Sequence, residues 1–460
     1  MSSRIEEAIQ VVPTARQLNW QRLEFIGFIH FGINTFNDVE WGQGHEDISI
    51  FNPAELDAEQ WVLTLQSAGM KGLILTCKHH DGFCLWPSRY SEHTIKNTPY
   101  KDGNGDIVRE VSEACKKHGM RFGVYLSPWD MTDQRYGQGK AYDDYFVDQL
   151  TELLTNYGDV FEVWFDGANG EGPNGKIQEY DWKRYYEVIR KLQPESVIAI
   201  MGPDVRWVGN EAGNVRENEW SVVPIAYADP DYTAENSQKV DDGTFSRLYE
   251  HEDEDLGSRE VINQFIGELV WYPAETDTSI RPGWFYHENE DHAVRSSEEL
   301  FDIYKKSVGG NSVLLLNIPP NKQGLITQYD SNVLKDLGEK IAVFNCELAN
   351  ECEYKVGENI EMLDVEYEKA SESHMIEIKL DKVTELQYIV LQEDLTKSQR
   401  IEKATIELID IDHNVTRYDF GTVGYKKIIE VNQSSKIKQV NINIEEYRGD
   451  KVYLSKISLY

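Results

Sequence analysis

The sequence predicts a (β/α)8 barrel of the TIM type, followed by a C-terminal antiparallel β-sandwich. Continuous apolar runs alternate with amphipathic helices, as in parallel strands that are buried on both faces. Polar residues follow these runs at an almost constant spacing. Beyond about residue 345 the pattern changes to strict alternation of apolar and polar residues, which is typical of a sandwich. We therefore expect a barrel domain over residues 1–345 and a sandwich domain over 346–460.

Five strand–helix units make up the first half of the predicted barrel. After a helical lead-in over 1–20, strands are expected at 25–32, 72–77, 121–127, 161–165 and 196–202, and helices at 52–68, 106–118, 141–157 and 181–192. The strand exits at His30, His79, Tyr125, Asp166 and Glu211 are 49, 46, 41 and 45 residues apart. An open doubly wound sheet is the rival fold, but it usually carries a glycine-rich phosphate loop after its first strand, and none is found in this sequence.

The second half of the chain is less regular. The acidic stretch 221–260, which includes His251–Asp255, is expected to be a long solvated loop. The remaining predicted barrel elements are a late strand at 268–273, a segment over the barrel mouth at 281–286, a helix at 297–308 and a last strand at 312–317. In the sandwich, alternation is clearest at 375–380, 404–409 and 440–444.

Composition excludes several classes of partner. The net charge of −34 argues against nucleic acid and against anionic membrane surfaces, whereas 11 Trp and 25 Tyr suit a neutral glycan. The five Cys have no zinc-binding spacing. The N-terminus has no apolar signal segment, so the protein is expected to be either cytoplasmic or secreted with its signal removed. We expect a monomer.

In a barrel, functional side chains lie at the C-terminal ends of the strands. Asp166 follows the buried run Val163–Phe165 and precedes Gly167, and a carboxylate in that position is costly unless it caps a helix or serves a reaction. The other strand exits supply His30, His79, His80, Asp81, Tyr125, Trp129, Trp164, Arg206 and Glu211.

Three functions are compatible with these side chains at the rim of the barrel, which is the edge formed by the C-terminal ends of its strands. Glycoside hydrolysis needs two carboxyl groups, and Asp166 and Glu211 follow predicted neighbouring strands. A metal-dependent hydrolase could use His30, His79, His80 and Asp166, although adjacent residues of a regular strand point to opposite faces. A non-catalytic sugar-binding barrel is the third alternative.

Five ordered motifs give the chain a specific resemblance to the α-L-fucosidases of glycoside hydrolase family 29. They are Gly27–Gly32, Lys78–Phe83, Gly123–Ser127, Val163–Gly167 and Leu315–Pro320. The resemblance implies a barrel with a sandwich behind it, no cofactor and no metal, and a retaining double displacement with Asp166 as nucleophile. The side chains that it implies for binding fucose are His30, His79, His80, Tyr125 and Trp164, together with the Glu40–Trp41 pair.

The segment Arg206–Gly213 resembles the subfamily that removes α-1,3- and α-1,4-linked fucose from branched, Lewis-type glycans. That resemblance implies Glu211 as acid/base, with Glu217 and Glu219 as rivals, and we expect Arg206 and Trp284 to contact the substrate as well. A broad-specificity α-L-fucosidase is the alternative. Retention predicts that the two catalytic carboxyl groups lie about 5–5.5 Å apart, whereas inversion predicts about 6.5–9.5 Å.

Overall fold

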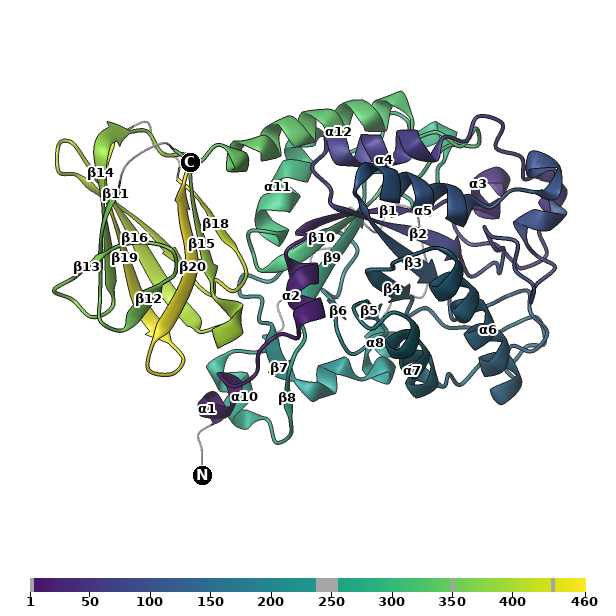
Figure 1. Ribbon diagram of the computed structural model, residues 1–460, viewed down its shortest axis with the longest axis horizontal. Coiled ribbons are helices and arrows are strands. Elements are labelled where there is room, and N and C mark those ends of the chain that lie inside the picture. Colours follow the sequence, from purple (N-terminus) through teal and green to yellow (C-terminus); the bar gives the residue numbers. More distant parts are fainter. Residues whose placement is uncertain (1–3, 237–254, 349–351, 432–434) are drawn as a thin grey trace.

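The computed structural model describes residues 4–236, 255–348, 352–431 and 435–460. Figure 1 shows two bodies side by side: a helix-covered parallel sheet and a β-sandwich, with α12 leading from the first to the second. No helix in the described part of the chain has both the length and the apolar character needed to cross a bilayer.

Eight parallel strands form the first body. They are β1 (Phe25–Ile29), β2 (Gly72–Lys78), β3 (Arg121–Leu126), β4 (Glu162–Phe165), β5 (Val197–Ile200), β6 (Arg206–Trp207), β9 (Ala274–Ser279) and β10 (Ser312–Asn317). Their order, β5-β4-β3-β2-β1-β10-β9-β6, confirms the predicted barrel class. Within the described ranges no ladder of hydrogen bonds joins β5 to β6, although the two strands are neighbours, so the barrel has one open seam.

Helices cover the outside of the strands (Figure 1). The longer ones are α4 (Ala58–Ser67), α5 (Ile107–His118), α6 (Lys140–Asn156), α7 (Trp182–Leu192), α11 (Ser297–Ser307) and α12 (Gln328–Ile341). The shorter ones are α1 (Arg4–Ala8), α2 (Ala15–Gln21), α3 (Ile33–Asn37), α8 (Pro230–Asn236) and α10 (Arg259–Gln264). The 3-10 turns are Ile48–Ile50, Ile95–Asn97, Tyr100–Gly103, Ile225–Ala228, Glu288–Glu290, Ala342–Asn345 and Leu395–Lys397.

Capping residues explain where the helices begin. Asp106 and Asp181 accept backbone N–H groups at the starts of α5 and α7, where the sequence predicts them. The prediction for α4 was wrong by six residues, because Asp57 caps the helix through the N–H groups of Glu59 and Gln60. The preceding residues pair instead with the segment after β10, through Glu55 N–H to the Gln323 carbonyl.

The second half of the barrel differs most from expectation. Residues 269–271 form β8 (Leu269–Trp271), which pairs with β7 (Val222–Pro224) in a separate antiparallel ribbon. The strand that enters the barrel is β9, Ala-Glu-Thr-Asp-Thr-Ser, and every one of its residues is buried. Its polar side chains are hydrogen-bonded, so a buried strand needs no apolar run here. The acidic loop predicted at 221–260 contains β7, α8 and the start of α10, while 237–254 lies outside the described residues.

The second body is a two-sheet sandwich with its own apolar core. One sheet has the order β13-β11-β14-β19-β16-β17 and the other β12-β20-β15-β18. The strands are β11 (Cys352–Val356), β12 (Ile360–Met362), β13 (Glu368–Lys369), β14 (Met375–Thr384), β15 (Tyr388–Glu393), β16 (Ile401–Asp410), β17 (Val415–Phe420), β18 (Lys427–Glu430), β19 (Ile437–Tyr447) and β20 (Val452–Leu459). The predicted alternating segments lie in β14, β16 and β19. Most pairs are antiparallel, but β11–β13 and β12–β20 are parallel.

Candidate active site

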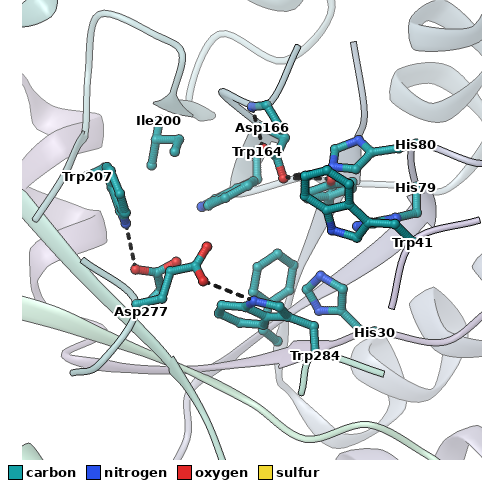
Figure 2. A pocket seen from close by; sticks show the side chains of 14 residues that line it. His30, Trp41, His79, His80, Trp164, Asp166, Ile200, Trp207, Asp277 and Trp284 are labelled. Carbon is teal, nitrogen blue, oxygen red and sulfur yellow. Dashed lines mark hydrogen bonds and ion pairs between the residues drawn. The ribbon is translucent and has the colours of Figure 1, made fainter. Parts of the chain in front are cut away.

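A pocket opens at the C-terminal ends of the barrel strands (Figure 2). It is lined by Phe28, His30, Trp41, His79, His80, Tyr125, Trp164, Asp166, Ala168, Ile200, Trp207, Glu211, Asp277 and Trp284. In Figure 2 the histidines and Trp41 lie on one side, while Trp207 and Asp277 face them from the other. The structure therefore brings together nine of the eleven residues that the sequence predicts for the site.

Asp166 lies directly after β4 with its side chain 23% exposed. One carboxylate oxygen accepts the Tyr125 hydroxyl at 2.9 Å, and the other accepts the Ala168 N–H at 2.7 Å. Burial, together with the adjacent carboxylate, raises the pKa of Tyr125 well above its usual value, so the phenol remains a donor. The carboxylate of Asp166 is thus oriented by two fixed donors, while His80 Nε2 faces it at 3.8 Å.

The hydrogen-bond network assigns the tautomer of His30. The Asn317 amide nitrogen donates to Ser279 Oγ and to the Trp284 carbonyl, so its Oδ1 is an acceptor. His30 Nδ1 lies 2.9 Å from that oxygen and must carry the proton. Burial lowers the pKa of His30 to about 4. At neutral pH the ring is therefore uncharged, and its Nε2 is an acceptor.

The hydrogen-bond network assigns the tautomer of His80 in the same way. The Ser127 hydroxyl donates to the Trp129 carbonyl at 2.7 Å, so His80 Nδ1, which lies 2.7 Å from Ser127 Oγ, is the donor of that pair. Burial lowers the pKa of His80, with Asp166 opposing the shift. A pocket lined by acceptor nitrogens and carboxyl oxygens suits a ligand that is rich in hydroxyl groups.

His79 and His80 both line the pocket, although strand alternation alone would have sent their side chains to opposite faces. Strand β2 ends at Lys78, so strand alternation does not apply to the two residues after it. Their ring centroids are 4.1 Å apart. Even so, in the ranges that the structure describes, no group of three or more His, Cys, Asp or Glu side chains is arranged to hold a metal ion.

Glu211 also lines the pocket, and its carboxylate accepts the Trp284 indole N–H at 3.3 Å. The prediction that Asp166 and Glu211 follow neighbouring strands was wrong. Asp166 follows β4 and Glu211 follows β6, and β5, which ends at Ile200, lies between those two strands.

The two rival carboxyl groups lie elsewhere. Glu217 is exposed outside this pocket. The Glu219 side chain is fully buried and paired with Arg206 and Arg216. Burial opposes its ionisation, but the two guanidinium groups outweigh burial and lower the pKa of Glu219.

Two predicted substrate contacts do not line the pocket. Arg206 points away from it, paired with Glu219 and donating to the Tyr272 carbonyl at 3.0 Å. The Glu40 carboxylate accepts the backbone N–H groups of Trp284 and Phe285 at 2.7 and 3.1 Å. Both residues fix segments that carry pocket side chains: Arg206 the segment of Glu211, and Glu40 the segment of Trp284.

The pocket also contains residues that sequence reasoning missed: Phe28, Ala168, Ile200, Trp207 and Asp277. Phe28 lies in β1 two residues before His30, within the predicted strand 25–32, so alternation along that predicted strand could have identified it. No pattern in the sequence indicated Asp277 as a pocket residue, because β9 lacks the run of apolar residues that is typical of a barrel strand. The Trp207 indole donates to Asp277 at 2.8 Å, so these two side chains form one unit of the wall.

Comparison with known proteins identifies the family. The α-L-fucosidase family model matches residues 18–345. The chain is 42% identical to α-L-fucosidase 1 of Arabidopsis thaliana over 340 residues, a match that spans 74% of this chain and 62% of that protein. Two crystal structures are similar. A candidate α-L-fucosidase from Bacteroides ovatus has 44% identity and a TM-score of 0.85, covering 100% of this chain and 76% of that one. A Ruminococcus gnavus GH29 fucosidase in complex with fucose has 30% identity and a TM-score of 0.80, covering 98% and 95%.

Proposed function

The chain belongs to the α-L-fucosidase family, and we propose that it is a retaining exo-α-L-fucosidase acting on α-1,3- and α-1,4-linked fucose of branched, Lewis-type glycans. One observation carries this proposal: Asp166, oriented by Tyr125, shares an aromatic-walled pocket with a second carboxyl group, Glu211. Two carboxyl groups in one sugar-sized pocket are the minimum that glycoside hydrolysis by double displacement requires.

In the proposed first step Asp166 attacks the anomeric carbon of fucose while the bond to the glycosidic oxygen breaks. Glu211 gives its proton to that oxygen, so the aglycone leaves as a neutral alcohol. In the second step Glu211 takes a proton from water, the hydroxide attacks the same carbon, and Asp166 is released as a carboxylate. Two inversions give net retention of configuration.

The neutral histidines fit the ground state of this reaction. With protonated Nδ1 atoms, His30 and His80 offer Nε2 as acceptors to sugar hydroxyl groups and add no positive charge beside the nucleophile. Trp41, Trp164 and Trp284 supply apolar faces for sugar C–H groups. Glu40 and Arg206 act through the segments that they hold and not by touching the sugar.

The linkage preference rests on the segment from Arg206 to Gly213, which carries Glu211 and resembles that of the 1,3/1,4-specific subfamily. We expect fast release of fucose from a Lewis-type trisaccharide and slow release from an α-1,2-fucosylated glycan and from simple aryl fucosides. Product analysis on this panel tests the linkage. Fast hydrolysis of all three substrates would instead establish the broad-specificity alternative.

Two further measurements test the reaction itself. The anomer of fucose that forms first, followed by NMR, should be the α-anomer, and a first-formed β-anomer would contradict retention. Fucose binding without turnover of any substrate in the panel would favour the non-catalytic barrel.

A further inference from the structure

Two buried carboxyl groups lie inside the barrel beneath the pocket, and the proposed reaction does not use them. Glu162 is the first residue of β4 and Glu275 belongs to β9, and they are 0% and 1% exposed. Around them the interior side chains of β1, β5 and β10 are apolar, including Ile26, Val197 and Val313. Across the described chain no Lys, Arg or His lies within ion-pairing distance of either carboxyl group.

Each carboxyl group accepts one indole N–H. Trp20 of α2 donates to Glu162 Oε2 at 2.8 Å, and Trp164 donates to Glu275 Oε1 at 2.7 Å. The remaining oxygens, Glu162 Oε1 and Glu275 Oε2, accept no hydrogen bond from any described N–H or O–H group. The two carboxyl groups are nevertheless in hydrogen-bonding contact with each other. Carboxylates only accept hydrogen bonds, so this contact requires a proton on one of the two groups, and a proton placed between Glu162 Oε1 and Glu275 Oε2 would satisfy both oxygens.

We propose that Glu162 and Glu275 share a proton inside the barrel, and that Glu275 is thereby a positioning residue that fixes Trp164 in the pocket wall. Trp164 stacks on Tyr125 with ring centroids 5.3 Å apart and planes inclined by 20°, and the Tyr125 hydroxyl donates to Asp166. The carboxyl pair thus controls the orientation of the nucleophile through two aromatic rings. The positioning role rests on the proposed fucosidase function, whereas the shared proton does not.

The electrostatic surroundings favour the protonated pair. Burial raises the pKa of Glu162 to about 7 and that of Glu275 well above its usual value, the latter with a further contribution from Glu162. Asp277 of β9 faces Glu275, and Asp166 in turn faces Asp277, so the nearby ionisable groups are acidic as well. Loss of the proton would place two adjacent negative charges in an apolar interior.

Thermal unfolding as a function of pH tests the shared proton without any substrate. A folded-state pKa above the unfolded value contributes stability that is complete below the ordinary glutamate pKa and is lost as pH rises through the folded value. We expect the Tm of Glu275→Gln, relative to wild type, to increase from about pH 5 to about pH 8, because a glutamine amide donates to Glu162 at every pH. Glu162→Gln should behave alike, while Glu187→Gln, an exposed change on α7, should leave the pH dependence unaltered. If the curves of Tm against pH were parallel for wild type, Glu275→Gln, Glu162→Gln and Glu187→Gln, the proposal would be overturned.

Kinetics test the positioning role. Glu275→Gln should keep kcat/KM within about threefold of wild type, whereas Glu275→Leu, which cannot accept the Trp164 N–H, should lower kcat by about 10- to 100-fold with a smaller change in KM. Trp164→Phe lacks the same N–H, so Glu275→Leu combined with Trp164→Phe should be no slower than the slower single variant. If the double variant lost kcat by the product of the two single losses, the two residues would act independently and the positioning role would be overturned. An equal loss of kcat in Glu275→Gln and Glu275→Leu would also overturn it.

The unfolding and kinetic experiments together distinguish failure of the shared proton from failure of the proposed function. If Glu275→Leu does not fold, Glu275→Gln and the pH series still decide whether the proton is shared. If the wild-type protein releases no fucose from any fucoside, the proposed function fails while the unfolding experiment keeps its meaning.

Discussion

The two halves of the pocket rim are built by different means. Exits of β1 to β4 carry His30, His79, His80, Tyr125 and Asp166 on regular, apolar strands that helices cover on the outside. Trp207, Glu211, Asp277 and Trp284 come from β6, β9 and the segments after them, where polar contacts replace apolar packing. Apolar strands predominate beneath the first half of the rim, where the Lys78–Asp130 ion pair and the Trp164–Glu275 hydrogen bond are also buried, whereas polar contacts predominate in the second half.

This difference has a consequence for mutations. In the first half a substitution at the rim removes a functional group and leaves the strand beneath it intact. In the second half the same groups that shape the rim also satisfy buried charges, so function and stability are coupled there.

The largest effect is expected at Asp166, in the first half. Asp166→Ala should lower kcat by roughly 10⁴-fold or more, because the covalent intermediate cannot form. The carboxylate is partly exposed and is not part of the core, so thermal unfolding should stay close to wild type. External azide should restore turnover and give the inverted azide product. Wild-type kcat in Asp166→Ala would remove this residue from the mechanism.

Glu211→Ala tests the second half of the rim. We expect a loss of about 10²–10⁴-fold in kcat on a Lewis-type trisaccharide and a smaller loss on a fucosyl donor whose leaving group needs no proton. Glu217→Ala is the matched control, since Glu217 is exposed outside the pocket, and it should keep wild-type kinetics. A larger loss in Glu217→Ala than in Glu211→Ala would reverse the assignment.

Glu219→Ala tests the coupling of stability and function. It leaves Arg206 and Arg216 buried without their carboxylate, and should reduce the free energy of unfolding by about 3–5 kcal/mol, measured by denaturant titration. The sandwich contacts the same position, because the Gln399 amide donates to the Glu219 carbonyl at 3.1 Å. Glu217→Ala should change stability by no more than about 0.5 kcal/mol. Equal stability of the two variants would show that the buried ion pairs do not hold this half.

The first half should show a pH dependence of its own. Burial lowers the pKa values of His30, His79 and His80, so the unfolded chain binds protons more readily than the folded one. Stability should therefore fall as pH drops below the ordinary histidine value of about 6.5 and continue to fall to about 4, the pKa of His30. The slope of Tm against pH should be shallower in His30→Asn and unchanged in His45→Gln, an exposed site.

The smallest effect is expected at His287, which clamps the segment of Trp284. Its ring nitrogens lie 2.8 Å from Asp38 and 2.7 Å from Glu40, and the contact with Glu40 is the main reason that its pKa is raised to about 9. His287→Gln should cost roughly 1–2 kcal/mol near pH 7 and raise KM a few-fold. Since a raised pKa gives stability that is lost as pH rises through it, the difference from wild type should shrink above about pH 9. A difference that persists there would mean that the charge on His287 is not what matters.

The first half of the barrel could be predicted from the sequence more completely than the second half. Apolar runs identified β1 to β5 and β10, and caps such as Asp106 and Asp181 identified the helix starts. β6 was missed because it has only two residues, and β9 because its buried side chains are polar. For the same reason the sequence supplied Asp166 and the histidines readily but not Asp277.

The sequence alone determined the barrel class, the sandwich behind it and most of the pocket's membership, because strand periodicity and the motifs at strand exits are local features of the chain. The tertiary structure decided what the buried polar groups do. It left Arg206 and Glu40 out of the pocket lining, where they bind neighbouring segments, and brought Asp277 into the lining. It also paired Glu162 with Glu275 across 113 residues of sequence. A buried polar side chain must find its partner in space, and no local pattern in the chain records where that partner lies.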